Sequence, residues 1–348
     1  GWSKWDFWQV GQFKFSFGPK LDGNLWRSTY DNLLRQKQRQ MRLARGAEWS
    51  NARTVESDLR GFQGSQVRYA IDSGSWSAWK PYKSRFDLQL GTKQGRQDVK
   101  VQLRSFRDVR SPVLKDSIKL DNVAPTIWGP RVNIREGVRI QKSGARVPTF
   151  VDMGSKETGV GLQSTTVRAD CRGSVWAKQT KPTAANGLNV QIDKSRCTLV
   201  SVAADKLGNQ RVRKLSPNLG ISDLRRSNAK ASFVGGWKML GAKEALGKTL
   251  ARATVKDATA KVTFSGSQFA VVARRGPAGG KLKVIVDGKT TATVDLYAKT
   301  GDPRRIVHVG NVPKGKHTVK LKATGTKRAA SKGTTVWLDA VLVLDRRK

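Results

Sequence analysis

Histidine and cysteine are nearly absent from this chain of 348 residues, which has only two of each. The cysteines, Cys171 and Cys197, form no C-x-x-C pair, so we expect no zinc site built from cysteine and histidine. The histidines, His308 and His317, are the only bases for a nucleophilic triad, and both lie in strand-like segments, IVHVG and KGKHTVKL. We therefore predict structural histidines, no catalytic residue, no metal ion, no cofactor and no enzyme activity.

Long apolar runs are also missing, because no stretch approaches the roughly 20 residues that a membrane-spanning helix needs. No G-x-x-x-x-G-K-[ST] or G-x-G-x-x-G loop follows a strand-like run. The Gly-rich segment GPAGG, residues 276–280, is expected to be a hairpin loop. No export signal is visible and the sequence starts at Gly1, so we expect a processed or trimmed chain, or one part of a longer protein.

Acidic residues are scarce. The chain has 66 Lys plus Arg against 26 Asp plus Glu, a formal net charge of +40, and residues 225–348 alone carry +20. Such an excess creates a positive surface potential that attracts polyanions. The expected partner is an anionic polymer or glycan surface, with nucleic acid a less favoured one. The alternative is a solvated basic surface without a dedicated ligand.

The residues that are present favour an all-β chain. Short apolar runs alternate with polar residues and are broken by Gly, Asn and Asp. QFKFSF, residues 12–17, has the period of two of a half-buried strand. Residues 28–45 differ, since Leu33, Leu34, Met41 and Leu43 suggest one short helix with a basic outer face. We assign residues 1–49 to this aromatic strand and basic helix, which could be the end of a preceding domain.

Residues 50–216 resemble two successive bacterial Ig-like modules. In the first, assigned to 50–124, the run VRYAID leads through a turn to WSAWKPY, and SIKL closes in LDNVAPT. In the second, assigned to 125–222, SKETGVG matches a loop of those modules, and SVAADKLGNQRVR matches their A-x-D-x-x-G-N corner. The resemblance implies two β-sandwiches and says almost nothing about a ligand. We interpret residues 216–228 as a polar linker.

Both cysteines fall in the second module, 26 positions apart, each at the edge of a strand-like run. We expect a Cys171–Cys197 disulfide, which would place the chain in an oxidising space outside the cytosol. The alternative is two separate buried thiols that behave as small apolar side chains.

The last segment, assigned to 223–348, resembles the galactose-binding-like jelly rolls of secreted actinobacterial proteins over residues 229–344. The residues that carry the resemblance are FSG at 264–266, VDG at 286–288, the G-x-H-T run at 315–318 and the closing LDA at 338–340. The resemblance implies a β-sandwich and often sugar binding, sometimes with calcium. The carboxylates of a calcium loop are not recognisable here, where only seven acids remain in 225–348.

Basic residues alternate with aliphatic ones in KLKVIVDG and HTVKLKATG. Successive strand residues point to opposite faces, so the lysines should point outward and the aliphatic residues inward. If the two strands share a sheet, the lysines form a positive stripe, with four arginines in nearby loops. The alternative is an ordinary polar face on which lysine discourages edge pairing. The predicted binding residues are Lys281, Lys283, Lys320, Lys322, Arg274, Arg275, Arg304 and Arg305.

Three functions are compatible with the sequence. The first is a non-enzymatic, exported multi-domain β protein that attaches to a cell envelope, a glycan or another anionic surface. The second is a structural subunit of an extracellular assembly, such as a phage tail or a surface filament. The third is an accessory C-terminal region of a secreted hydrolase. All three predict an extracellular, cell-surface or virion location.

Overall fold

A computed structural model describes residues 40–62, 64–141, 146–193, 197–224 and 231–345. The all-β prediction is confirmed, because a single short 3-10 turn is the only helical element in these ranges. The helices that the structure describes include none long and apolar enough to cross a membrane. The expected aromatic strand in residues 1–20 and residues 28–39 of the expected helix lie outside the described residues.

The chain divides into two units. Unit 1 comprises Gly1–Val123 with Thr158–Gly161, and unit 2 comprises Ala124–Glu157 with Leu162–Lys348. The described strands of unit 1 form a three-stranded sheet, ordered β1-β3-β6, and a five-stranded sheet, ordered β2-β8-β7-β4-β5. The elements are β1 (Gln40–Leu43), η1 (Ala44–Gly46), β2 (Trp49–Ser50), β3 (Thr54–Arg60), β4 (Gln66–Ile71), β5 (Lys80–Pro81), β6 (Arg85–Gln89), β7 (Gly95–Arg104) and β8 (Leu114–Leu120).

The inward residues of both sheets build one core in unit 1, which includes Leu43, Leu59 and Val101. Leu43 is part of β1, which pairs antiparallel with β3. The expected helix was therefore wrong over residues 40–45, which form a strand and a 3-10 turn. Met41 and Leu43 alternate with polar residues, and pairing with β3 supplies the hydrogen bonds that a local pattern cannot reveal.

The first part of unit 2 is a sandwich of a three-stranded sheet, β13-β10-β9, and a four-stranded sheet, β12-β11-β14-β15. β11 and β14 pair so that Cys171 lies directly opposite Cys197, and the two cysteines form the predicted disulfide. The strands are β9 (Thr126–Ile134), β10 (Arg146–Lys156), β11 (Leu162–Cys171), β12 (Ser174–Lys181), β13 (Ala185–Asp193), β14 (Cys197–Asp205) and β15 (Gln210–Leu215).

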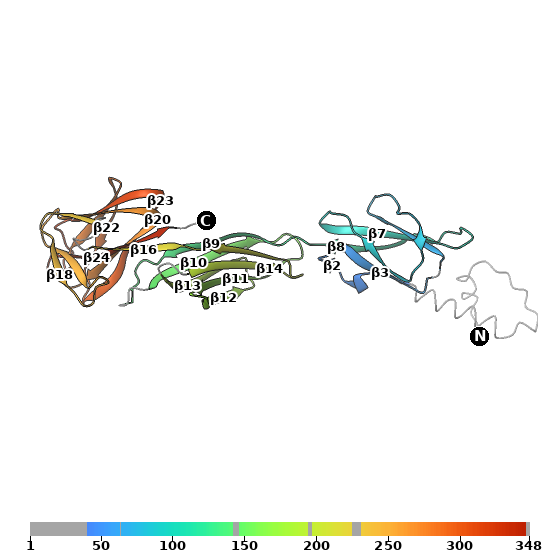
Figure 1. Ribbon diagram of the computed structural model, residues 1–348, viewed down its shortest axis with the longest axis horizontal. Helices are drawn as coiled ribbons and strands as arrows, with labels where there is room; N and C mark the ends of the chain where they lie inside the picture. Colours follow the sequence, from blue (N-terminus) through green and yellow to red (C-terminus); the bar gives the residue numbers. More distant parts are fainter. Residues whose placement is uncertain (1–39, 63, 142–145, 194–196, 225–230, 346–348) are drawn as a thin grey trace, which may run out of the picture. The chain divides into compact units, whose positions relative to one another are not determined.

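The second part of unit 2 is a nine-stranded sheet with the main order β18-β19-β24-β20-β23-β21-β22. Figure 1 labels β16, β18, β20, β22, β23 and β24 of this sheet. β16 pairs with β24, and β17 pairs with β20. The strands are β16 (Asn218–Asp223), β17 (Ala231–Val234), β18 (Lys238–Gly241), β19 (Thr249–Ala253), β20 (Thr259–Arg275), β21 (Lys281–Val286), β22 (Lys289–Asp295), β23 (Asp302–Ala323) and β24 (Val336–Asp345).

β16 lies inside the segment that we interpreted as a polar linker. Residues 218–223 instead bond to residues 340–345 of β24, and Leu219 is buried. The linker interpretation was wrong over these residues, because their hydrogen-bond partners lie more than a hundred residues further along the chain. The C-terminal sheet therefore begins at β16.

β24 is buried on both of its faces, which explains why its run VWLDAVLVL is apolar except for Asp339, whose buried carboxylate accepts the Leu246 N–H. Val341 and Val343 belong to the core of the C-terminal sheet. Ala340, Leu342 and Leu344 join the core of the β9–β15 sandwich. The two β systems of unit 2 thus share a strand that contributes to both hydrophobic cores.

Candidate functional site

The four predicted lysines lie on two adjacent strands of the C-terminal sheet. β21 and β23 pair antiparallel in a register that sets Lys283 opposite Lys322. On the other side of β23, β20 pairs in a register that sets Lys261 opposite Lys320. Residues directly opposite each other project from the same face of a sheet, so the three strands build one cationic surface. We call this surface the lysine face and define it by Lys261, Lys281, Lys283, Lys320 and Lys322.

The aliphatic residues between the lysines fill the core, as predicted. Leu282 and Leu321 are fully buried, whereas Lys261 and Lys320 are exposed. The other three lysines are half-buried, with their stems along the sheet. Such side chains cover apolar surface with their methylene groups and keep the ammonium group in water. The face is therefore cationic at its surface and anchored by a packed core beneath.

Most of the positive charge of the lysine face is not compensated. Of these five lysines, only Lys322 has a carboxylate partner among the described residues, with its Nζ 3.0 Å from Asp257 Oδ1. Asp295 lies opposite Lys281 in the β21–β22 register, but its Oδ2 pairs with Arg328 at 2.8 Å. Four of the five lysines of the face thus keep their positive charge without an ion pair among the described residues.

The four predicted arginines lie on strands of the same sheet as the lysine face. β20 is 17 residues long and its register sets Thr259 opposite Lys322 at one end, and Arg275 opposite Asp302 at the other. Register shifts interrupt this pairing at three points, and only residues 276–280 separate Arg275 from Lys281. The expectation that these arginines lie in loops was wrong, because they belong to the end of β20 and the start of β23. Their binding role stays a prediction. The four are Arg274, Arg275, Arg304 and Arg305.

The arginines of β23 instead hold the two β systems of unit 2 together. Arg304 Nε donates to the carbonyl oxygen of Ile140 at 2.9 Å. Arg305 forms a backbone bridge with Arg139, whose guanidinium donates twice to Asp302 Oδ1, at 2.6 and 3.0 Å. The segment after β9 thereby extends the pairing to the start of β23.

The arginines of β20 are also used within the protein. Arg274 Nη1 lies 3.0 Å from Glu244 Oε1, in an ion pair of which both members are partly exposed. Arg275 Nη2 donates to the carbonyl oxygen of Tyr297 at 2.8 Å. These interactions orient the guanidinium groups toward the protein and reduce their availability to an external anion.

His317 is a structural clamp. Its Nδ1 lies 2.7 Å from Asp287 Oδ2, its Nε2 lies 2.7 Å from the carbonyl oxygen of Pro313, and Thr318 N–H donates to Asp287 Oδ1 at 2.8 Å. The hydrogen bond to Asp287 raises the pKa of His317, and the same bond lowers the pKa of Asp287. The imidazolium thus ties the β21–β22 turn to β23.

His308 is half-buried on β23, and burial lowers its pKa below the ordinary value, opposed by the charge of Glu136. Its buried Nε2 has no hydrogen-bond partner among the described residues. Neither histidine is hydrogen-bonded to a hydroxyl or thiol in the part of the chain that the structure describes. Within the same residues, no group of three or more His, Cys, Asp and Glu side chains is arranged to hold a metal ion.

Unit 1 carries a stack of alternating arginine and tryptophan side chains. The Arg68 guanidinium carbon lies 4.6 Å from the centre of the Trp76 ring and 4.5 Å from that of Trp79. The Arg104 guanidinium carbon also lies 4.6 Å from the centre of the Trp79 ring. Each such interaction contributes about 0.5–2 kcal/mol, depending on exposure. The W-x-x-W run therefore stabilises the outer face of the five-stranded sheet.

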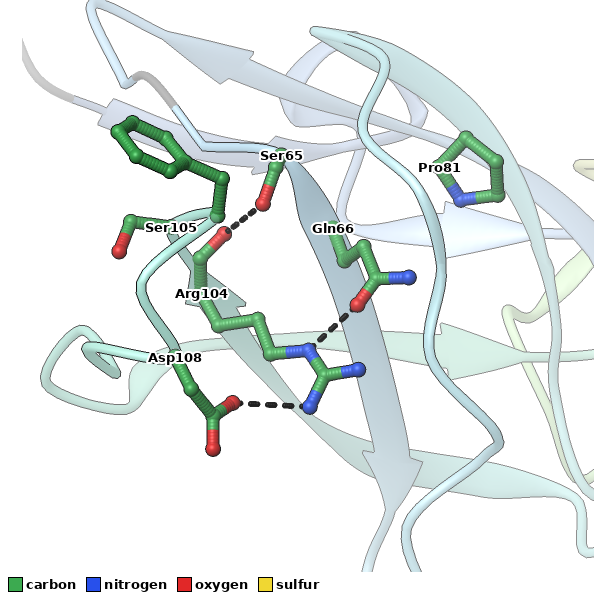
Figure 2. Close-up of a pocket in the computed structure, with 7 residues that line it drawn as sticks. Ser65, Gln66, Pro81, Arg104, Ser105 and Asp108 are labelled. Atoms are coloured by element: carbon green, nitrogen blue, oxygen red, sulfur yellow. Dashed lines mark hydrogen bonds and ion pairs between the residues drawn. The ribbon is translucent and has the colours of Figure 1, made fainter.

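A hollow of about 500 Å³ lies beside the end of this stack. Figure 2 shows Arg104 bridging it, with Nε donating to Gln66 Oε1 and Nη1 donating to Asp108 Oδ1 at 2.8 Å. The guanidinium is thus occupied by protein acceptors and supports the wall of the hollow. The lining residues are Ser65, Gln66, Pro81, Arg104, Ser105, Phe106 and Asp108.

No protein-family profile matches the chain, and no curated protein matches it. Solved structures share a β-rich region with it. A two-domain esterase active on acetylated mannans, crystallised with mannopentaose, is 13% identical, with 37% of each chain covered and a TM-score of 0.29. The chain therefore spans little more than a third of that esterase.

Two further structures give similar values. The CBM36-1 domain of a multidomain xylanase from the hindgut metagenome of Trinervitermes trinervoides is 16% identical, with 36% of this chain and 95% of that domain covered, and a TM-score of 0.26. A family two carbohydrate esterase from Cellvibrio japonicus is 14% identical, with 37% of this chain and 34% of that chain covered, and a TM-score of 0.28. Such distant likeness assigns no ligand to this chain.

Two features of these surfaces were not predicted from the sequence. Lys261 belongs to the lysine face, although its strand precedes β23 by a long stretch of sequence. Its alternation with Ala260 and Val262 was a usable signal for an outward position. Arg68 and Arg104 were not linked to the tryptophans, because only the β4–β7 register brings them to one face.

Proposed function

We propose that this protein is a non-catalytic attachment protein that binds an anionic polymer of a cell envelope or glycan surface through the lysine face. The observation that carries the proposal is the set of five lysines on one sheet face, of which only Lys322 has a carboxylate partner among the described residues. A sheet face of this kind offers a row of ammonium groups at fixed spacing. Repeated anionic groups along a polymer can bind several of them at once.

The electrostatic field of the whole chain supports the same function. The net charge of +40 concentrates polyanions near the surface, and the lysine face then supplies the short-range interactions. Each lysine that neutralises a polymer charge releases a condensed counterion, so binding should weaken as salt concentration rises. The positive charge therefore attracts the polymer to the protein and also stabilises the bound complex.

The disulfide supports an exported protein. Disulfides persist in oxidising compartments and are rare in the cytosol. The Cys171–Cys197 bond is consistent with a location at or outside the cell surface, where envelope polymers and glycans are found. The two histidines, one clamped to Asp287 and one half-buried, support a protein that binds without performing a reaction.

The test compares two variants of the full chain with equal net charge. In the face variant, the four lysines of the lysine face that have no ion pair are replaced by Gln, and Lys322 is kept. In the control variant, four exposed lysines elsewhere are replaced by Gln: Lys178, Lys206, Lys214 and Lys238. Retention is measured on immobilised polygalacturonate, poly(glycerol phosphate) and duplex DNA over a range of salt concentrations. These three ligands distinguish carboxylate, phosphodiester and nucleic-acid recognition.

We expect the face variant to lose retention on the envelope-type polymers, whereas the control variant keeps it. On duplex DNA, removal of each lysine that binds a phosphate should reduce the slope of log affinity against log salt by about 0.9, hence by roughly 3–4 in total. Equal losses in the two variants would mean that the lysines form only a solvated surface. Binding that does not respond to salt would mean that the electrostatic mechanism is wrong.

A further inference from the structure

The outer face of the β13-β10-β9 sheet carries two exposed aromatic rings. Trp128 on β9 is 47% exposed and Phe150 on β10 is 39% exposed. The opposite face of the same sheet packs into the core through residues such as Val132 and Val151, which are fully buried. The two rings therefore contribute to the outer surface of this sheet.

Both rings lie over glycines of the neighbouring strands. A Cβ added at Gly154 would lie 2.2 Å from the Trp128 ring, and one added at Gly187 would lie 2.3 Å from the tip of the Phe150 ring. Only glycine leaves room for a ring to lie against the backbone in this way. Both rings thus lie close to the backbone of the sheet and keep a substantial exposed area, which a stacking ligand could cover.

An ion pair with no net charge lies in the same face. Asp152 is opposite Arg131 in the β9–β10 register, and the guanidinium donates to Asp152 Oδ2 at 2.9 and 3.2 Å. Both of these hydrogen bonds use Oδ2 of Asp152, and the Arg131 side chain is 63% exposed. Free acceptor and donor positions on two planar groups therefore face solvent next to the rings.

We infer that this surface, which we call the aromatic platform and define by Trp128, Arg131, Phe150 and Asp152, binds an extended chain of neutral sugars. A pyranose ring has apolar C–H faces that stack on aromatic rings, and hydroxyl groups at its edge that bond to planar carboxylate and guanidinium groups. The platform provides both on one face. The charges of Arg131 and Asp152 cancel, although the net charge of the protein is +40. The platform therefore selects its ligand by stacking and hydrogen bonding and not by charge.

A single-stranded nucleic acid is the competing ligand, because bases also stack on aromatic rings. The Asp152 carboxylate in the platform argues against it, since a carboxylate repels the phosphate backbone. A purely structural role is the other competitor, because aromatic rings can stabilise glycines in neighbouring strands. The experiment must separate all three. This inference does not depend on the lysine face, which belongs to a different sheet.

The test uses the full chain and a set of neutral oligosaccharides of glucose, xylose, mannose and N-acetylglucosamine, with an oligo-dT strand as competitor. The ring-less variant is Trp128→Ala with Phe150→Ala. Its matched control is Phe106→Ala, which removes an 85% exposed ring from unit 1. A second variant, Trp128→Phe with Phe150→Tyr, keeps two rings and guards against loss of fold. Calorimetric titrations are run at about 0.15 M and about 1 M salt, between which the Debye length falls from about 8 to about 3 Å.

We expect at least one neutral oligosaccharide to bind, with an affinity that changes less than about twofold between the two salt concentrations. The ring-less variant should bind it at least about tenfold more weakly, since removing one stacking ring costs roughly that factor. The ring-keeping variant, Phe106→Ala and the face variant should all bind as the unmodified chain does.

Three results would overturn the inference. If no oligosaccharide of the set binds the folded chain, the platform is not a sugar site. Unchanged sugar binding by the ring-less variant would place the site elsewhere on the protein. If oligo-dT binds through the two rings and no sugar does, the platform stacks bases.

Discussion

Gln268 is a buried amide at the junction between the two β systems of unit 2. Its side chain is 1% exposed on β20. Its Oε1 accepts the backbone N–H of Ile134 at 2.7 Å, and its Nε2 donates to Oδ1 of Asn311 at 2.9 Å and of Asn133 at 3.3 Å. Two of these partners belong to β9. We therefore predict that Gln268→Leu destabilises unit 2 while leaving unit 1 unchanged.

The size of the effect follows from the partner that is left without a bond. Leucine has nearly the volume of glutamine, so the change opens no large cavity. The Ile134 N–H loses its acceptor in a buried position, which costs about 1–3 kcal/mol. The two asparagine oxygens are closer to solvent and can take water instead. At about 2–4 °C per kcal/mol for a unit of this size, a cost of about 2 kcal/mol lowers the melting temperature by roughly 4–8 °C.

Differential scanning calorimetry of the full chain measures this shift. Gln210→Leu, on an exposed position of β15, is the control and should change the stability by less than about 0.5 kcal/mol. An unmoved unit 2 transition in Gln268→Leu would refute the reasoning that this amide supports the junction. A shift confined to unit 1 would refute it equally, because no unit 1 residue bonds to Gln268 among those the structure describes.

Three further predictions concern His317 and the disulfide. The pKa of His317 is raised above 6.5 and that of Asp287 is lowered below 3.8, so the bond between them should stabilise the fold fully between these two pH values. The stabilisation should be lost as pH rises through the raised pKa of His317. It should also be lost as pH falls through the lowered pKa of Asp287. The melting temperature of His317→Gln should therefore differ most from that of the unmodified chain between pH 3.8 and 6.5, and a pH-independent difference would contradict the assignment. Alkylation followed by intact-mass measurement should label no cysteine in the native protein and two after reduction, whereas labelling of the native protein would disprove the disulfide. Replacing both cysteines by Ser should cost about 3–4 kcal/mol for a loop of this length.

Sequence patterns succeeded where one local property determines the structure. The alternation of basic and aliphatic residues correctly predicted that Lys281 and Lys283 point outward and that Leu282 is buried. This works because side chains alternate between the two faces in every strand, wherever the strand lies in a sheet. The paired cysteines were predictable because both flank strand-like runs in one module. The binding role of the lysines stays a prediction, since their placement does not identify a ligand.

Patterns failed where the deciding partner is distant in sequence. Residues 218–223 look like a linker until β24 supplies their hydrogen bonds. The four arginines look like loop residues until strand pairing places them on β20 and β23. The aromatic platform escaped notice because Trp128, Phe150 and the two glycines beneath their rings meet only through strand pairing.

The position of β24 has a consequence for the order in which unit 2 can fold. β24 lies between β19 and β20, yet it is the last strand of the described chain to leave the ribosome. Both hydrophobic cores of unit 2 use its side chains, so neither core is complete on the nascent chain before Val336–Asp345 emerge. Unit 1 has no such dependence on β24 and can fold while the rest is still being made. For an exported protein, this delay would leave unit 2 incompletely folded during synthesis, when a translocation machinery needs an extended chain.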